Sequence, residues 1–327
     1  MYLAEYLLSI REFLAEEYPT GETEYREALV ERAFFCVDEE RKRKAEKIRP
    51  GRARAASLGA GLLLQLAVGE AIQGNEAGAF AVGNAVEMAE TFYRNVAGGS
   101  EEDNAAGGTK AECPVYSVSQ LLTRLEKLPR RSLTYRYGEK GKPYFRDLPY
   151  YFSLSHSGDY VFCALSTEEI GADIQQHRRQ LKEDNRRRLA ERFFSEEEKR
   201  ALETFGERET LFYRLWTRKE AFGKLTGEGV AGILDVNLLP ADSVPNVSKM
   251  SLKGKILLKE EALSGKSVSP EDGITPKEGA LQENRHRAGQ ENDMPAREKN
   301  LPPGRQLIWK EYGNIPGYSI ALCYVTA

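Results

Sequence analysis

The spacing of apolar residues divides the chain into strand-like and helix-like segments. Two short apolar runs, residues 160–166 and 170–175, are separated by three polar residues, as is typical of paired strands. A later run, residues 317–325, resembles the first of them. Between these runs, apolar residues recur at helical spacing over residues 183–205 and 207–225. This order predicts an α+β fold built from two halves of related architecture.

Charged residues dominate residues 37–54, and an apolar stretch follows from Leu58. We expect a basic helix or loop and then a core helix. The basic cluster fits a solvated face, and it also fits a phosphate-binding surface. The apolar stretch, residues 58–72, is interrupted by Gln65 and Glu70, so it is too short and too polar to span a bilayer.

Two segments have the composition of insertions. Residues 73–115 are rich in Gly, Ala, Asn and Glu and predict a flexible insertion, with a short helix near residues 87–94. Residues 264–306 contain almost no aliphatic or aromatic residues, so they cannot bury enough surface to offset ordering entropy and are predicted to be disordered. We expect an N-terminal α+β subdomain over residues 1–167 and a C-terminal one over residues 168–327.

The composition of the chain argues against several classes of protein. The 327 residues carry a formal charge of −3, which gives no global sign of nucleic-acid or membrane binding. The four cysteines are scattered and only three histidines occur, so a zinc site or a disulfide framework is not expected. The N-terminus lacks the basic start and apolar core of a signal peptide. We expect a cytoplasmic protein.

The segment of residues 215–229 combines apolar and charged groups in register. On a helix, Trp216, Glu220 and Lys224 share a face, and Lys219 lies beside it. One carboxylate flanked by two ammonium groups suits a site that holds a cation together with a polyphosphate. The plainer alternative is a surface ion pair between Glu220 and Lys224.

Asp173 lies within an apolar strand, on the same face as Gly171 and Gln175. An inward carboxylate there requires a partner or a cation, whereas an outward one would only face solvent. The turn that contains Ser155 and His156 offers hydroxyls, an imidazole and backbone N–H groups to a phosphate, or serves as a structural turn.

Two further positions, taken alone, are weaker evidence for a functional site. Lys142 projects from a Gly-Lys-Pro turn. Glu198 belongs to a run of three carboxylates at a helix start, behind the N-cap residue Ser195, and the helix dipole alone explains acidic residues there.

These elements occur in a fixed order along the chain: G-K-P, S-H-S-G-D, G-A-D-I-Q, R-F-F-S-x-x-E and W-T-x-K-E-A-x-x-K-x-x-G-x-G. The set, over residues 142–229, resembles the 4′-phosphopantetheinyl transferases of the larger, surfactin-synthetase-activating type. The resemblance implies two α+β subdomains in a pseudo-twofold arrangement with coenzyme A between them. It also implies Mg²⁺-dependent transfer of 4′-phosphopantetheine from coenzyme A to a serine of an apo acyl or peptidyl carrier protein, with release of 3′,5′-ADP.

The resemblance also assigns roles to individual positions. The implied metal ligands are Asp173 and Glu220, with Gln175 where the family usually carries a second strand carboxylate. An amide is a poorer ligand for a hard cation, so we expect a water in that position and a weaker metal site. The implied catalytic residues are Glu198, Lys219 and Lys224. The implied coenzyme A contacts are Lys142, Ser155, His156 and either Arg54 or Arg52.

Two other classes of function stay open. A binding module for coenzyme A or a carrier protein, weakened in catalysis, draws support from Gln175 alone. A nucleic-acid binder would use residues 41–54, but the mixed charges there argue against it. We therefore expect coenzyme A and a carrier protein as partners, no nucleic acid and no membrane, and a monomer.

Overall fold

The computed structural model describes residues 1–14, 23–76, 113–177, 182–234, 236–240 and 306–326. Residues 1–250 and 306–327 form one compact unit, to which all the described residues belong; residues 251–305 form a second. The segment expected to be disordered, the helix expected near residues 87–94 and most of the flexible insertion lie outside the described residues.

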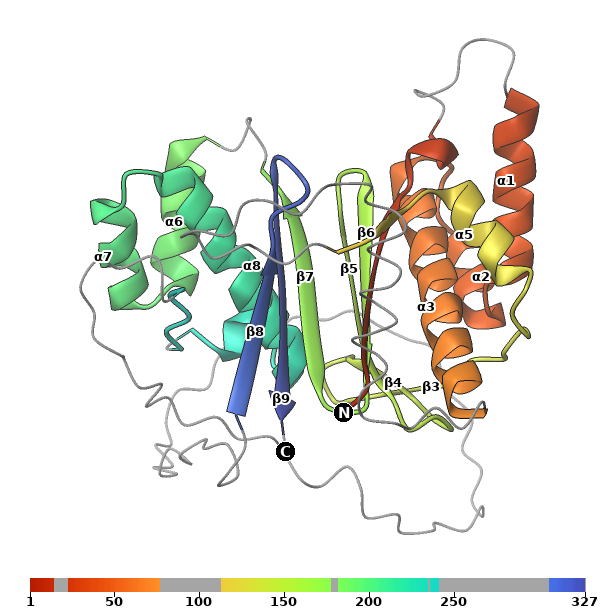
Figure 1. Ribbon diagram of the computed structural model, residues 1–327. Helices are drawn as coiled ribbons and strands as arrows, with labels where there is room; N and C mark the ends of the chain where they lie inside the picture. Colours follow the sequence, from red (N-terminus) through yellow and green to blue (C-terminus); the bar gives the residue numbers. More distant parts are fainter. Residues whose placement is uncertain (15–22, 77–112, 178–181, 235, 241–305, 327) are drawn as a thin grey trace, which may run out of the picture. The chain divides into compact units, whose positions relative to one another are not determined.

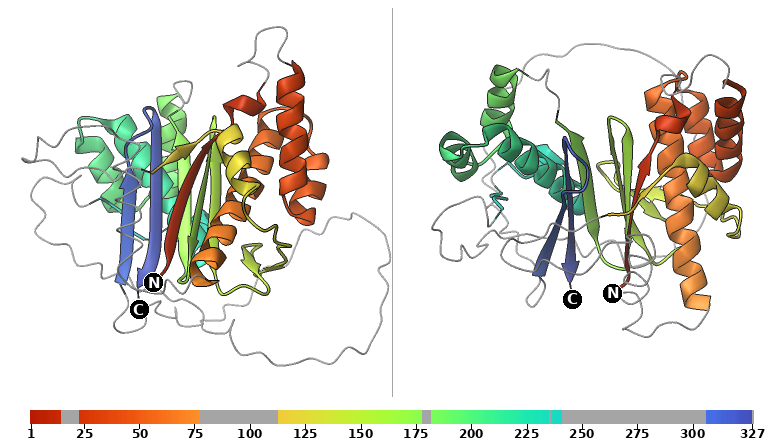
Figure 2. Two further views of the ribbon diagram at one scale, coloured as in Figure 1. Left: turned by 45° about the vertical axis from the view of Figure 1, so that its right-hand side comes forward. Right: turned by 45° about the horizontal axis from the view of Figure 1, so that its top comes forward.

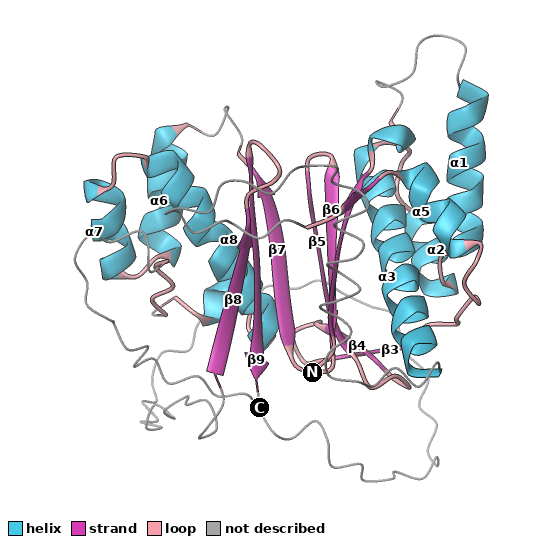
Figure 3. Cartoon of the chain, viewed as in Figure 1, coloured by secondary structure: helices cyan, strands magenta, loops and turns pink. Residues whose placement is uncertain are grey.

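A four-stranded sheet organises the first half of the chain. Its order is β2 (Val115–Tyr116), β1 (Leu3–Ser9), β6 (Tyr160–Ser166) and β5 (Tyr151–Ser157). β1 and β5 both run antiparallel to β6, and the short β2 runs parallel to β1. Figure 3 distinguishes these strands from the helices that flank them.

Helices cover one face of this first sheet (Figure 1). They are α1 (Thr23–Cys36), α2 (Glu39–Glu46), α3 (Arg52–Glu76) and α5 (Val118–Leu125). The leucines of α3 pack with apolar residues of β1 and β6 in one core cluster, which confirms the expected core helix. The expectation that this apolar stretch is too short and too polar to span a bilayer is wrong, because α3 alone among the described residues is long and apolar enough to do so. Most of that stretch is nevertheless buried within the protein.

A three-stranded antiparallel sheet organises the second half. Its order is β7 (Ile170–Gln176), β9 (Tyr318–Thr326) and β8 (Gln306–Tyr312). The accompanying helices are α6 (Glu183–Phe193), α7 (Glu196–Thr204) and α8 (Arg208–Thr226). The predicted helix start at Ser195 is confirmed, because its hydroxyl accepts the Glu198 N–H while the Glu198 carboxylate accepts the Ser195 N–H.

α8 lies directly on β7 because Gly171 has no side chain. A Cβ at Gly171 would come within 1.9 Å of the Ala221 carbonyl oxygen. Strand side chains alternate, so the face that Gly171 presents to α8 is the one that also carries Asp173 and Gln175. Gly171 therefore permits the close contact with α8, and Asp173 and Gln175 face the same side further along the strand.

The two sheets meet through their other faces (Figure 2). Leu7 and Phe162 of the first sheet join Ala172, Ile320 and Leu322 of the second in one buried cluster. The layers in this unit are thus helix, sheet, sheet and helix, an α+β arrangement. A small hairpin, β3 (Tyr135–Tyr137) with β4 (Pro143–Phe145), and two 3-10 helices, Arg11–Phe13 and Val230–Gly232, complete the described elements.

Candidate functional site

Asp173 is a buried carboxylate, and several of the other candidate residues lie close to it. Its side chain is 7% exposed. Oδ1 accepts hydrogen bonds from Ser155 Oγ at 2.6 Å and from Lys224 Nζ at 2.7 Å. Oδ2 is buried and accepts none from any described residue. A buried carboxylate oxygen without a donor is costly, so this atom is suited to binding a cation.

α8 supplies the second carboxylate and the ammonium group. Glu220 and Lys224 are one turn apart, as the sequence predicted, and Lys224 contacts Asp173 and also the Ala172 carbonyl oxygen at 3.2 Å. The pKa of Glu220 is raised by burial and then by the nearby Asp173, while Lys224 partly opposes the shift. A carboxylate whose charge is disfavoured by a neighbouring carboxylate is suited to sharing a divalent cation with it.

Gln175 shares the face of Asp173, and its Nε2 donates to the Gln176 carbonyl oxygen at 3.1 Å. Within the described part of the chain, no group of three or more His, Cys, Asp and Glu side chains is arranged to hold a metal ion. Two carboxylates nevertheless fit Mg²⁺, which is commonly bound by one or two of them together with substrate phosphates and water. The orphaned Oδ2 of Asp173 supports that fit.

Ser155 and His156 were expected in a turn, but both lie within strand β5 and therefore point to opposite sides of it. Ser155 is buried against Asp173, whereas His156 is exposed. The pKa of His156 is lowered, first by partial burial and then by Lys224, with smaller contributions from Lys44 and Arg41 and an opposing one from Asp173. At neutral pH the imidazole is therefore an uncharged hydrogen-bonding group beside several cations.

Arg41 and Lys44, both on α2, are the cations that sequence reasoning did not single out. Their charges act on His156, so they lie on the same side of the molecule as Lys224. Their i, i+3 spacing, which places both side chains on one helix face, was the available signal.

The two arginines predicted as alternatives have other partners. Arg54 Nε donates to the Ile48 carbonyl oxygen at 2.7 Å, near the end of α2. Arg52 pairs with Asp159, which also binds Arg11 at 3.1 Å. Asp159, in the turn that follows β5, therefore takes part in two ion pairs.

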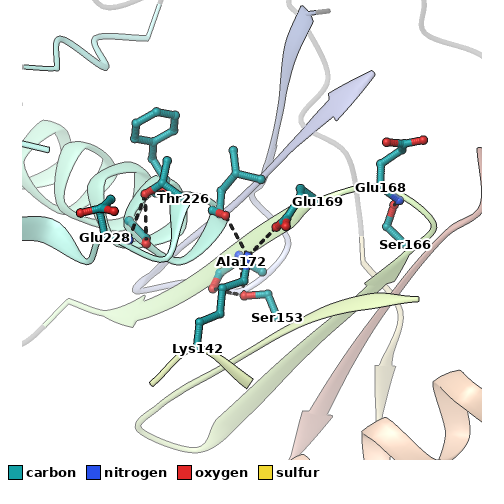
Figure 4. Close-up of polar contacts among 11 residues, drawn as sticks. Lys142, Ser153, Ser166, Glu168, Glu169, Ala172, Thr226 and Glu228 are labelled. Atoms are coloured by element: carbon teal, nitrogen blue, oxygen red, sulfur yellow. Dashed lines mark hydrogen bonds and ion pairs between the residues drawn. The ribbon is translucent and has the colours of Figure 1, made fainter. Parts of the chain in front are cut away.

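The side chain of Lys142 contacts the C-terminal end of α8 (Figure 4). Its Nζ lies 2.6 Å from Glu169 Oε2 and donates to the Leu225 carbonyl oxygen at 2.8 Å, and its side chain is 11% exposed. An ammonium there complements the negative end of the helix dipole. Lys140 pairs with Glu228 just beyond α8, so the turn between β3 and β4 contacts both the last turn of α8 and the residues that follow it.

Glu198 and Lys219 form an enclosed ion pair. The distance from Lys219 Nζ to Glu198 Oε2 is 2.9 Å, and neither side chain is exposed. The Ser195 and Leu238 N–H groups donate to Glu198, and Lys219 donates to the Val236 carbonyl oxygen at 2.6 Å. The pair joins α7, α8 and the segment that follows them.

The structure therefore separates the predicted residues into two groups. One group lies around the Asp173 carboxylate: Ser155, His156, Glu220 and Lys224. Gln175 lies on the same face of β7, where its amide donates to the Gln176 carbonyl oxygen. The other residues are engaged elsewhere: Lys142, Glu198, Lys219, Arg52 and Arg54.

Comparison with known proteins supports a class for this site. Residues 169–266 match the model of the 4′-phosphopantetheinyl transferase superfamily. The match begins at the start of β7 and includes α8, so it contains both implied carboxylate ligands.

Curated relatives agree with this class. The chain is 36% identical over 121 residues to the 4′-phosphopantetheinyl transferase Sfp of Bacillus subtilis, covering 36% of this chain and 52% of the relative. It is 35% identical over 117 residues to psf-1 of Bacillus pumilus, covering 35% and 48%. Against AcpT of Salmonella typhimurium it is 43% identical over 105 residues, covering 31% and 53%. The chain spans about half the length of these relatives, and its predicted resemblance to 4′-phosphopantetheinyl transferases of the surfactin-synthetase-activating type is confirmed.

Proposed function

We propose that this protein transfers 4′-phosphopantetheine from coenzyme A to a serine of an apo acyl or peptidyl carrier protein, with Mg²⁺ as cofactor and 3′,5′-ADP as the second product. One observation carries the proposal. The Asp173 carboxylate is buried, binds Lys224 and Ser155 through one oxygen and has no described partner on the other. Its charge also raises the pKa of Glu220 on α8. The relatives, named as 4′-phosphopantetheinyl transferases, support this choice.

Asp173 and Glu220 would hold the Mg²⁺ ion, with Gln175 contributing through a water molecule. The bound ion supplies charge stabilisation to the pyrophosphate oxygens of coenzyme A as the anhydride bond breaks. In this reaction the serine oxygen bonds to the phosphorus that carries pantetheine. The bridging oxygen leaves with 3′,5′-ADP, and the proton of the serine hydroxyl is released to solvent water.

The cationic groups around Asp173 would bind and orient the phosphates. Lys224 places an ammonium beside the carboxylates, where charge develops on the leaving oxygens. His156 offers a neutral imidazole, and the helix face of Arg41 and Lys44 supplies charge without contacting the reacting atoms.

Glu198 and Lys219 were implied as catalytic by the resemblance. Their complete enclosure favours a positioning role, because a side chain without exposed surface cannot meet a carrier protein while the surrounding segment stays in place. We propose that the pair holds α8, and with it Glu220 and Lys224, in register with β7.

We extend the proposal to the organisation of the chain. Two α+β subdomains in pseudo-twofold relation would divide between β6 and β7, at residues 167 and 168, with coenzyme A bound between them. We also propose a monomer in the cytoplasm. The four cysteines, all within the described residues, are free thiols, which agrees with a reducing compartment.

The test is the intact mass of a purified apo carrier protein after incubation with this protein, coenzyme A and Mg²⁺. The expected result is a mass gain of one phosphopantetheine, lost with Glu220→Ala. If several carrier proteins gain no mass although coenzyme A binds, the transferase proposal is wrong and a non-catalytic binding module replaces it.

A further inference from the structure

Three serines form a row on the buried face of β5. Ser153, Ser155 and Ser157 alternate along the strand, and each is less than a tenth exposed. The side of β7 that does not pair with β9 faces this row. The polar groups along this edge of β7 therefore meet serine hydroxyl groups of β5, and not the backbone groups of a second hydrogen-bonded strand.

The outer two serines contact the backbone of β7. Ser153 Oγ accepts the Ala172 N–H at 2.9 Å and donates to the Ala172 carbonyl oxygen at 3.4 Å, as Figure 4 shows. Ser157 Oγ accepts the Gln176 N–H at 3.0 Å. These two hydroxyls satisfy backbone groups that would otherwise be buried without partners.

The central serine differs, because its hydroxyl goes to a side chain. Ser155 Oγ donates to Oδ1 of Asp173 at 2.6 Å, the same oxygen that binds Lys224, and Oδ2 is left without a described partner. Two donors on one oxygen fix the plane of the carboxylate and direct the other oxygen toward a cation.

We propose that Ser155 is a positioning residue that holds Asp173 in place for the metal ion. This inference rests on the proposed function, because the metal is the one that function requires. Hydrogen bonds to metal-binding carboxylates set ligand orientation, and their loss commonly weakens metal affinity by about 10- to 100-fold. The same loss is expected for Ser155→Ala.

The experiment measures Mn²⁺ binding to the purified full chain by electron paramagnetic resonance, without coenzyme A. Binding of coenzyme A is measured separately by calorimetry in EDTA. We expect Ser155→Ala to weaken Mn²⁺ binding about 10- to 100-fold and to leave metal-free coenzyme A binding within about twofold. Ser153→Ala is the matched control, since it removes a buried hydroxyl from the same row but not from the carboxylate, and it should leave Mn²⁺ affinity unchanged.

A second pair of variants guards against loss of folding. Ser155→Thr and Ser155→Val have nearly the same shape, and only the threonine keeps the hydroxyl. Tighter Mn²⁺ binding by the threonine variant supports the inference, and equal binding overturns it. Weaker metal-free coenzyme A binding in Ser155→Ala with unchanged Mn²⁺ affinity, or no saturable Mn²⁺ binding to the unmodified chain, also overturns it. Transfer to a carrier protein is assayed independently, so failure of the proposed function can be distinguished from failure of this inference.

Discussion

Lys219 and Glu198 form an ion pair with 2.9 Å between Nζ and Oε2, and neither side chain is exposed. Removing one partner leaves a buried charge uncompensated, so we expect Lys219→Met to lower the free energy of unfolding by about 3–5 kcal/mol. Urea unfolding followed by tryptophan fluorescence measures this change.

The control for this prediction is the surface pair of Lys199 and Glu196 on α7. Lys199→Met should cost less than about 1 kcal/mol, since solvent screens that pair. Full stability of Lys219→Met together with lost transfer would instead assign Lys219 to the chemistry.

Gln175→Glu places a third carboxylate on the face of β7 that carries Asp173. If Gln175 lies at the metal, the Mg²⁺ concentration for half-maximal transfer should fall severalfold, because an anionic oxygen is a better ligand than an amide. Gln176→Glu, one residue further and on the other face, is the matched control. An unchanged Mg²⁺ requirement in Gln175→Glu would place Gln175 away from the metal.

His156 should make stability depend on pH. Its pKa in the folded protein is lowered by partial burial and by Lys224, Lys44 and Arg41, against the opposing charge of Asp173. As pH falls below about 6.5, the unfolded chain takes up this proton before the folded protein does, so the free energy of unfolding decreases. Below the folded pKa both states hold the proton and the decrease ends.

His156→Gln removes the titrating group and should reduce this loss. Urea unfolding of both proteins at pH 8 and pH 5.5 gives the comparison. Equal losses of stability in the two proteins would show that the imidazole is not held neutral.

Lys44→Ala should weaken coenzyme A binding, by about tenfold for one lost charge-assisted contact of about 1.4 kcal/mol. Lys47, at the C-cap of the same helix, provides the control variant Lys47→Ala. Calorimetry at two salt concentrations measures both. Equal weakening by the two variants would mean that general charge, rather than the α2 face, attracts the ligand.

Local patterns predicted the elements that carry the site. The face shared by Glu220 and Lys224, the capping box at Ser195 and the strand around Asp173 all follow from periodicities of a few residues, and the structure contains them. The strand β1 was not predicted, because its central residues are buried on both faces and show no alternation.

Partners distant in the sequence could not be assigned in the same way. Helical spacing suggested Glu220 as the partner of Lys224, whereas the fold gives Lys224 to Asp173. The coenzyme A contacts implied for Ser155 and Lys142 stay predictions, and no local pattern indicated that these side chains contact Asp173 and Glu169. These pairings depend on how sheets and helices stack, which no local pattern encodes.

The strand order of the second sheet has a consequence for folding. β7 ends at Gln176, yet its hydrogen-bonded neighbour β9 begins only at Tyr318 and lies between β7 and β8. Pairing over so long a loop is slow, because the chain must lose closure entropy before any ladder forms. During synthesis, β7, which carries Asp173, therefore has an unpaired edge until β9 has been made. Substitutions in β9 should reduce the yield of active protein even where they touch no ligand.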